Sequence, residues 1–328
     1  MKRSKHSIVV PVYNEFEGLP SLAERLEKLA ETLSPDFTEI LFVNDGSRDG
    51  SDKVLDRLVQ SNPIFKVIHL SRNFGHQLAI TAGLERANGN TVSIIDADLQ
   101  DPPEVIVELI SQWKEGYDVV YAQRRSREGE TKFKLWTAKL FYRTIRRFTQ
   151  VDIPLDTGDF RLMDRKVVTA FLRLRERHRF VRGMVSWLGF RQTGVLYDRA
   201  ERKFGETHYP LRKMIKFAVD GITSFSSVPL RFATYIGLAS SLFAFFVGVW
   251  SLYVKFFAGE AIPGWTSVML AVLFMSGIQL LALGVFGEYL GRTYDEIKGR
   301  PLYLVQRTAG FEYEQVAELD QIYESISI

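Results

Sequence analysis

Acidic side chains follow three short apolar segments in the N-terminal half, and their types suit a divalent cation. The segment that ends at Ile95 is followed by DADLQ (96–100), and two others run into VYNE (12–15) and VND (43–45). Mg²⁺ is typically held by one or two carboxylates together with phosphate oxygens of a substrate and water. Asp96, Asp98 and Gln100 are therefore candidate ligands for Mg²⁺ or Mn²⁺.

An Asp-x-Asp pair is a weak signal by itself. With each acid at roughly 6% of residues, about one such pair is expected by chance in a chain of this length, and an Asp in a surface turn often only caps a helix. The position after a buried apolar run strengthens the metal interpretation. The chain has no cysteine, which excludes thiolate metal sites and disulfides. It also has neither G-x-G-x-x-G nor a P-loop motif, which disfavours those nucleotide folds.

Alternating strand and helix patterns must position these side chains. Apolar β-rich runs occur at 7–12, 40–43, 65–70, 91–95 and 119–122, and helical patterns at 19–33, 51–60, 76–86 and 103–114. This alternation predicts an α/β, Rossmann-like fold with a mainly parallel, doubly wound sheet. Ligands of such sheets bind beyond the carboxyl ends of the strands, where the acidic residues fall. Asp101, followed by Pro102 and Pro103, is predicted to be the N-cap of the last helix.

Two uncharged stretches, 232–254 and 261–287, dominate the C-terminal part. About 20 residues suffice for a helix to cross a hydrocarbon core of ~30 Å. We therefore expect two transmembrane helices, at about 232–254 and 265–287, that form an antiparallel hairpin. A pair of helices buried in a soluble protein is the less favoured alternative, because uncharged runs this long are most stable in lipid.

Charge flanking these stretches predicts the orientation. Basic residues precede the first stretch and follow the second, namely Arg212, Lys213, Lys216 and Arg231, then Arg292, Lys298, Arg300 and Arg307, whereas the loop carries only Lys255. The positive-inside rule then places both termini in the cytoplasm of a multi-pass inner (plasma) membrane protein. We expect a cytoplasmic domain at 1–209, a juxtamembrane amphipathic helix at 210–230, the hairpin at 231–290 and a cytoplasmic segment at 291–328.

Basic residues also concentrate between Arg124 and Arg147, although the net charge is only +3. Such a cluster suits nucleic acid, anionic lipid or phosphate, and the apolar stretches favour lipid and phosphate over nucleic acid. Basic amphipathic patterns at 132–148 and 211–225 predict helices at the lipid interface. Ordinary surface helices packed on the core are the alternative for both.

Several motifs occur in a fixed order along nearly the whole chain. They are VPVYNE (10–15), NDGSRD (44–49), LSRNFG (70–75), DLQDPP (98–103), GDFRL (158–162), GEYLGR (287–292) and KGRP (298–301). Together they resemble glycosyltransferase family 2, in the branch of polyisoprenyl-phosphate glycosyltransferases that includes dolichol-phosphate mannose synthase and bactoprenol glucosyltransferases. The resemblance implies a GT-A-type catalytic domain. The chain departs from the usual pattern at Asn44, where Asp is common.

The resemblance also implies roles for individual residues. Nucleotide-lining residues would be Pro11, Tyr13, Glu15, Asp45 and Asp96, with Tyr13 beside the base. Asp96, Asp98 and Gln100 would surround the metal and the diphosphate, and Asp98 and Asp159 would be the catalytic residues. We read Asp159 as a positioning group or optional base, with a turn cap as the alternative. Arg202, Lys203 and Arg124 would meet the acceptor phosphate, although Thr207 and His208 replace the usual Ser and Lys of the motif that begins at Arg202.

These features lead to one expected reaction and several alternatives. The leading hypothesis is transfer of a hexose to undecaprenyl phosphate with inversion of the anomeric configuration. The favoured donor is UDP-glucose, so that the hexose is glucose. A phosphate monoester with a second pKa near ~6 is largely ionised at neutral pH and needs little help from a base. GDP-mannose or another UDP-sugar is an alternative donor, and a non-enzymatic membrane scaffold is an alternative function. A processive synthase is disfavoured because two spans cannot form a polymer channel. Membrane lipids are expected partners, and a homo-oligomer is left open.

Overall fold

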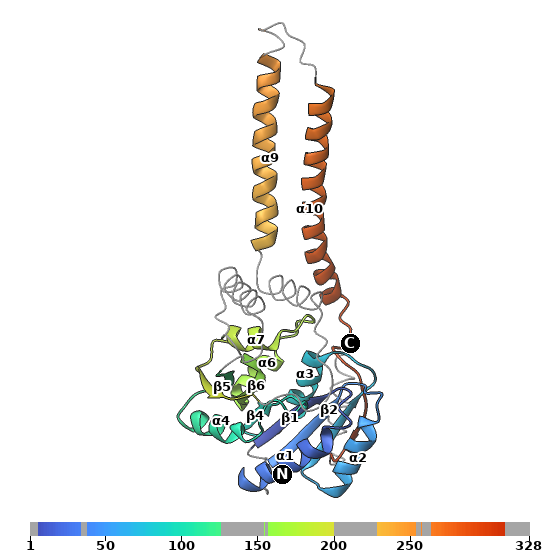
Figure 1. Ribbon diagram of the computed structural model, residues 1–328, viewed down its shortest axis with the longest axis vertical. Helices are drawn as coiled ribbons and strands as arrows, with labels where there is room; N and C mark the ends of the chain where they lie inside the picture. Colours follow the sequence, from blue (N-terminus) through green and yellow to red (C-terminus); the bar gives the residue numbers. More distant parts are fainter. Residues whose placement is uncertain are drawn as a thin grey trace. The chain divides into compact units, whose positions relative to one another are not determined.

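The computed structural model describes residues 6–33, 38–125, 154, 157–199, 228–253, 257 and 264–311. The chain divides into two compact units. One unit, formed by Met1–Tyr142, Val151–Pro210 and Arg300–Ile328, contains the sheet, and the other, formed by Arg143–Gln150 and Leu211–Gly299, contains two long helices (Figure 1).

The first unit is built on an eight-stranded sheet in the order β7-β5-β6-β4-β1-β2-β3-β8. The strands are β1 His6–Val12, β2 Thr38–Asn44, β3 Phe65–Leu70, β4 Thr91–Ile94, β5 Val119–Arg124, β6 Thr157–Asp164, β7 Gln192–Tyr197 and β8 Val305–Ala309. Strands β1 to β4 form one parallel block, and β5 pairs in parallel with β7. Only β6 and β8 run antiparallel to their neighbours. The prediction of a mainly parallel sheet is confirmed.

Helices cover both faces of this sheet. They are α1 Leu19–Leu33, α2 Ser51–Ser61, α3 His76–Arg86, α4 Val105–Lys114, α6 Arg165–Leu172 and α7 Val181–Trp187. Helices α1, α2 and α4 bury apolar side chains in one cluster with Val10 and Phe42 of the strands. Val9, the next residue of β1, points to the other face because side chains alternate along a strand. There it lies so close to Gly83 of α3 that a Cβ at Gly83 would come within 2.3 Å of it.

The structure contains every strand and helix that the alternation predicts in residues 7–122, within a few residues at the ends. The prediction for Asp101 is wrong. Helix α4 begins at Val105 with Glu104 as its N-cap, and Pro102 and Pro103 belong to the turn before it. Asp101 is instead buried, and its carboxylate accepts a hydrogen bond from Tyr197.

Two long apolar helices make up the described part of the second unit. They are α9 Val228–Tyr253 and α10 Trp265–Ile297. Within them, Leu230–Trp250 and Ala271–Ile297 have mean hydropathies of 1.8 and 1.7, and none of either window is buried. Both are candidate membrane spans, as the sequence predicts. Helix α10 continues beyond residue 287, where the span was expected to end.

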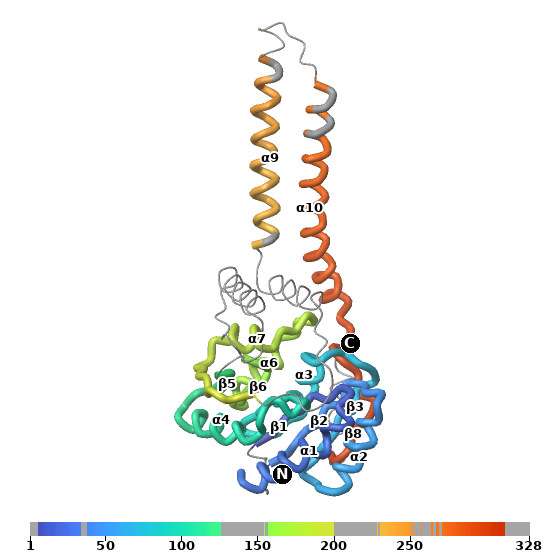
Figure 2. The backbone as a smooth tube through the Cα atoms, in the orientation of Figure 1, coloured from blue at the N-terminus to red at the C-terminus, as the bar shows by residue number. Residues whose placement is uncertain are grey.

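The C-terminal segment returns to the sheet after α10. Strand β8 pairs antiparallel with β3 and forms one edge of the sheet (Figure 2). The side chain of Tyr303 adds a hydrogen bond to Glu85 of α3. A part of the C-terminal segment expected at 291–328 is therefore a structural element of the first unit.

The close approach of α3 to β1 gives a testable prediction. Gly83→Ala would gain about 1 kcal/mol of helix propensity, but the added methyl group overlaps Val9 and should cost about 1–3 kcal/mol. We expect a net loss of stability in thermal unfolding of the full-length protein. Gly237→Ala in α9, where the Cβ would meet open space, is the control, and a higher melting temperature for Gly83→Ala would contradict this packing.

Candidate functional site

The turn after β1 is fastened to the loop after β2 at the carboxyl edge of the sheet. Asn14 has a positive φ of 55°, and its backbone N–H donates to Ser47 Oγ at 3.0 Å. The N–H of Glu15 donates to Ser51 Oγ at 3.1 Å. These bonds turn the chain sharply after the strand. Tyr13 is left 47% exposed at this edge.

Asp45, which follows β2 at this edge, is hydrogen-bonded to the backbone of the loop before α3. Its carboxylate accepts hydrogen bonds from the N–H groups of Phe74 at 2.7 Å and Gly75 at 2.9 Å. Burial raises the pKa of Asp45, and these two bonds oppose the rise. Asp45 therefore holds the turn that leads into α3, in addition to any contact with a ligand.

The turn after β4 presents the Asp-x-Asp pair. Leu99 has a positive φ of 59°, a conformation that costs free energy for a residue with a branched side chain. Its side chain is buried in the apolar cluster, which holds the turn in place. Asp98 Oδ1 accepts a hydrogen bond from the N–H of Gln100 at 3.1 Å. A buried leucine thus fixes the direction of the polar residues on both sides of it.

Asp96 lies among other negative charges. Burial raises its pKa, the charge of His76 lowers it, and the charges of Asp101, Asp159 and Asp98 raise it further, to about 6. Asp96 Oδ1 is buried and accepts no hydrogen bond from the residues that the structure describes, although His76 Nε2 lies 3.4 Å away. The site therefore has unused capacity for positive charge next to this oxygen.

Asp159, on β6, is the most strongly stabilised carboxylate of the group. Arg182 of α7 donates from Nε to its Oδ1 at 3.0 Å, and Gln77 donates from Nε2 to its Oδ2 at 3.0 Å. Asp159 is only 3% exposed. Burial alone would raise its pKa, but Arg182 and His76 outweigh burial and hold the pKa well below the usual value. Asp159 is thus a permanent anion at neutral pH.

His76, the first residue of α3, connects the two carboxylates. Its Nε2 lies 3.3 Å from Asp159 Oδ2 and 3.4 Å from Asp96 Oδ1. Burial works to lower the pKa of His76, but the hydrogen bond to Asp159 and the charges of both carboxylates raise it to about 9. A protonated His76 therefore offsets part of the repulsion between Asp96 and Asp159.

A second group of charges lies beside Asp98. Tyr197 donates to Asp101 Oδ1 at 2.5 Å, and Arg199 places Nε 3.3 Å from Asp101 and Nη2 3.7 Å from Asp98. Burial lowers the pKa of Arg124, but Tyr197 and Asp101 raise it overall. Buried atoms of Asp101, Arg124 and Arg199 lack a hydrogen-bond partner among the described residues. Such atoms at one edge are typical of a ligand site.

The structure brings together Asp96, Asp98 and Asp159, and it places Arg124 beside Asp101. Pro11 is buried inside β1, opposite Val43. Arg202 and Lys203 lie outside the described residues, as do the amphipathic patterns at 132–148 and 211–225. The sequence motifs did not indicate the hydrogen-bonding and cationic partners of these carboxylates, which are the amide of Gln77 and the charged side chains of His76, Arg182 and Arg199. Only the position of His76 directly after the LSRNFG motif could have indicated one of them.

The residues present fit a divalent cation. Among the described residues, no three His, Cys, Asp or Glu side chains form a complete metal site. Mg²⁺ needs no more than one or two carboxylates when substrate phosphates complete its octahedron. Asp96 and Asp98 supply hard oxygen donors, and Asp96 Oδ1 has no hydrogen-bond partner among the described residues.

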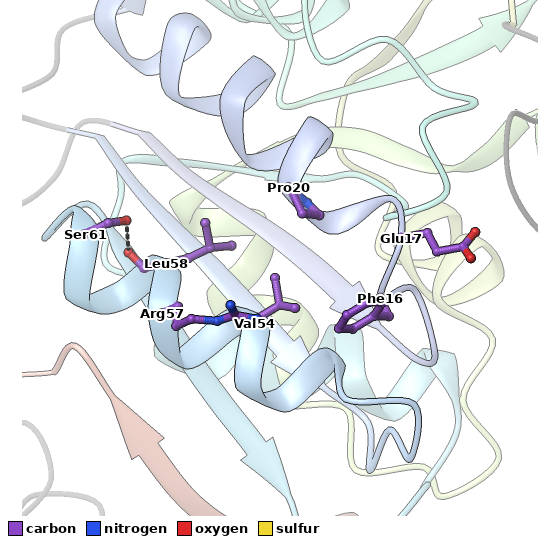
Figure 3. Close-up of a pocket in the computed structure, with 7 residues that line it drawn as sticks. All are labelled: Phe16, Glu17, Pro20, Val54, Arg57, Leu58 and Ser61. Atoms are coloured by element: carbon purple, nitrogen blue, oxygen red, sulfur yellow. Dashed lines mark hydrogen bonds between the residues drawn. The ribbon is translucent and has the colours of Figure 1, made fainter.

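A separate groove lies between α1 and α2, away from the acidic cluster. It has a volume of about 410 Å³ and is lined by Phe16, Glu17, Pro20, Val54, Arg57, Leu58 and Ser61 (Figure 3). The lining is mostly apolar, and it includes neither Asp96 nor Asp98. The carboxyl edge of the sheet is therefore the better candidate for chemistry.

Comparison with known proteins identifies the family. The sequence pattern described as glycosyl transferase family 2 matches residues 7–171. This chain is a family 2 glycosyltransferase. The resemblance seen in the ordered motifs is thereby confirmed, and so is the expectation of an enzyme.

Relatives match this glycosyltransferase over almost its whole length. It is 53% identical to the uncharacterized glycosyltransferase YkcC of Bacillus subtilis (strain 168), over 95% of this chain and 96% of the relative. It is 42% identical to the prophage bactoprenol glucosyl transferase homolog of Escherichia coli (strain K12), over 92% and 99%. Identity to the bactoprenol glucosyl transferase of Shigella phage SfII is 41%, over 93% and 98%. The similarity therefore extends past the sheet unit into the apolar helices.

The ion pair at Asp159 predicts a pH-dependent defect. Arg182→Gln leaves the buried carboxylate without its main cation and should lower the free energy of unfolding by roughly 3 kcal/mol at pH 7. The lowered pKa of Asp159 contributes stability above its unfolded-state value, and that stability is lost as pH falls through the folded-state pKa. In the variant this pKa rises, so the difference from wild type should shrink as pH falls below the raised pKa of the variant, and it should vanish below the lowered pKa of the wild type.

Chemical unfolding at several pH values measures this difference. Arg125→Gln is the matched control, because Arg125 pairs with Asp198 where both side chains are largely exposed. That exposed pair should contribute no more than ~1 kcal/mol to the free energy of unfolding. Equal losses in the two variants would argue against a buried ion pair at Asp159.

Proposed function

We propose that this glycosyltransferase transfers a hexose from a nucleotide-sugar to a polyisoprenyl phosphate at the cytoplasmic face of a membrane. The observation that carries the proposal is the 41–42% identity to bactoprenol glucosyl transferases over at least 92% of both chains. It favours UDP-glucose as the donor and undecaprenyl phosphate as the acceptor. GDP-mannose and other UDP-sugars are the alternative donors.

In this proposal, Asp96, Asp98 and Gln100 bind a Mg²⁺ or Mn²⁺ ion with the donor diphosphate. A divalent ion neutralises the negative charge that develops on the departing nucleoside diphosphate. The raised pKa of Asp96, which burial and then the neighbouring carboxylates cause, supports this assignment because a bound cation would offset both effects. Asp98 lies in the same turn and takes part at the reacting centre.

The nucleotide is proposed to lie against the turns after β1 and β2, with Pro11, Tyr13, Glu15, Asp45 and Asp96 around it. The exposed ring of Tyr13 offers a face on which a base can stack. The turn that carries Tyr13 and Glu15 is held by backbone hydrogen bonds to Ser47 and Ser51. A turn held in this way loses little conformational freedom when a ligand binds.

Asp159 is proposed to position the reacting groups rather than to accept a proton. Its carboxylate already accepts hydrogen bonds from Arg182 and Gln77 and lies beside His76. A carboxylate with a strongly lowered pKa is a weak base. The acceptor phosphate is itself largely ionised at neutral pH, so direct attack on the anomeric carbon needs no strong base and inverts the configuration.

The acceptor phosphate is proposed to meet Arg124, Arg202 and Lys203. Arg124 lies at the end of β5 within the polar group around Asp101. Guanidinium groups bind phosphates through paired, charge-assisted hydrogen bonds. The candidate membrane helices α9 and α10 would keep the enzyme at the surface where a lipid acceptor resides.

A direct assay tests the reaction. Purified full-length enzyme, Mg²⁺ or Mn²⁺ and undecaprenyl phosphate are incubated with radiolabelled UDP-glucose, GDP-mannose and UDP-N-acetylhexosamines. We expect transfer from UDP-glucose, with a β-linked product in proton NMR. Asp96→Asn should reduce transfer at least ~100-fold and raise the free energy of unfolding of the chelator-treated protein by ~1–3 kcal/mol at pH 8, because the fold destabilises this charge.

The control for this pair of measurements is Glu24→Gln, which removes an exposed carboxylate paired with Lys28. It should change neither transfer nor stability appreciably. Absence of transfer from every donor would refute the proposed reaction. Loss of both stability and transfer in Asp96→Asn would instead assign Asp96 a structural role.

The membrane orientation can be tested because the chain has no cysteine. A single cysteine is introduced at Phe257, between α9 and α10, or at Ser61 on α2. The positive-inside rule predicts that a membrane-impermeant maleimide labels only position 257 in intact cells, after permeabilisation of any outer membrane. Labelling of position 61 before the inner membrane is opened would reverse the assigned orientation.

A further inference from the structure

Four polar side chains connect the C-terminal strand β8 to the end of β2, and we name them the edge relay. They are Arg307 on β8, Asp56 on α2, His69 on β3 and Asn44 at the end of β2. They lie outside the acidic cluster around Asp96. Consecutive members are in direct contact, so the relay crosses three neighbouring strands of the sheet.

The relay begins with a paired ion contact. Arg307 donates from Nη1 to Asp56 Oδ1 at 2.7 Å and from Nη2 to Asp56 Oδ2 at 2.6 Å. Such two-point contacts are stronger and more directional than single ones. Arg307 is also the residue of β8 that pairs with His69 of β3. The C-terminal strand therefore brings a cation directly over this part of the sheet.

His69 links Asp56 to Asn44 in the interior of the sheet unit. It is 2% exposed, and burial together with the charge of Arg307 lowers its pKa although Asp56 opposes this. A neutral ring has one donor and one acceptor nitrogen. Nε2 faces Asp56 Oδ1 at 3.2 Å and Nδ1 faces Asn44 Nδ2 at 3.0 Å. The network assigns the proton to Nε2, so Nδ1 accepts from the Asn44 amide.

This geometry explains the departure from the usual Asp at position 44. A carboxylate there has no proton to donate, so it would favour a second proton on the ring, at Nδ1, and a charged His69. An amide can donate to His69 with its nitrogen and still accept with its oxygen. Asn44 Oδ1 accepts from the N–H of Ser47 at 3.0 Å.

The last contacts reach the turn assigned to the nucleotide. Ser47 Oγ accepts the hydrogen bond from the N–H of Asn14, and Asn14 Oδ1 accepts from the N–H of Arg48 at 2.9 Å. Asn14 stands between Tyr13 and Glu15 and has a positive φ. The strained turn is thus held by the loop that Asn44 orients.

We propose that Arg307 is a positioning residue for the nucleotide, acting through the edge relay on the turn at residues 13–15. The segment that follows the second apolar helix thereby sets how tightly the donor is held. This inference rests on the proposed function in naming the donor nucleotide as the ligand, whereas the structural coupling along the relay stands apart from it.

The decisive variant is Arg307→Gln, with Arg25→Gln as the matched control. Arg25 makes an equivalent two-point contact with Glu104 elsewhere in the same unit. Losing one contact of the relay should raise the KM for the nucleotide-sugar about 3- to 10-fold with kcat nearly unchanged. Amide hydrogen exchange at residues 14, 47 and 48 should accelerate by a similar factor, and Arg25→Gln should change neither quantity.

Asn44→Ala provides a second test, because it breaks the relay without touching the ion pair of β8. It should reproduce the effects on KM and on exchange at residues 14 and 47 while leaving exchange in β8 unchanged. If Arg307→Gln accelerates amide hydrogen exchange only in β3 and β8 and leaves KM unchanged, the proposal is overturned. Arg307 would then only stabilise the pairing of β8 with β3. Exchange decides the relay even for an enzyme without activity, whereas absence of wild-type transfer refutes only the proposed function.

Discussion

Mutual repulsion of carboxylates at the carboxyl edge of the sheet is the constraint on which the site depends. Asp96 follows β4 and Asp159 lies on the neighbouring strand β6; Asp159 is almost fully buried, and Asp96 is partly buried, so water screens their charges incompletely. The fold compensates the negative charge of these two carboxylates to different extents. Asp159 accepts hydrogen bonds from Arg182 and Gln77, whereas one oxygen of Asp96 has no hydrogen-bond partner in the described part of the chain. One carboxylate is therefore a fixed part of the structure, and the other is the one that the proposed function assigns to the cation.

The turns at this edge show how local strain is supported by distant packing. Asn14 and Leu99 both have positive φ angles, yet they are held by different means. The buried side chain of Leu99 anchors its turn in the apolar cluster, whereas Asn14 is held by hydrogen bonds from the loop after β2. A ligand at this edge thus meets one turn fixed by the core and one fixed by a polar network, which respond to different substitutions.

The sequence predicted the parts of the fold that depend on local patterns. Strands β1 to β5 and helices α1 to α4 follow from apolar periodicity, and the acidic residues stand out because they end strands. Arg182 and His76 could not be predicted as partners of Asp159, because antiparallel β6 and helix α7 bring together residues far apart in the chain. Asp101 precedes two prolines, as a helix cap often does, but its long-range hydrogen bond with Tyr197 decides its position, and local sequence does not reveal that contact.

The place of β8 in the chain has a consequence for biosynthesis. Strand β3 ends at Leu70, but the strand that covers its outer edge begins at Val305, after both long apolar helices. Ribosomes deliver the N-terminal strands first, so this edge of the sheet stays open while α9 and α10 are made. An open edge is a template for pairing with other chains. The growing protein therefore carries this aggregation hazard until β8 emerges, and a product truncated before residue 305 would keep it permanently.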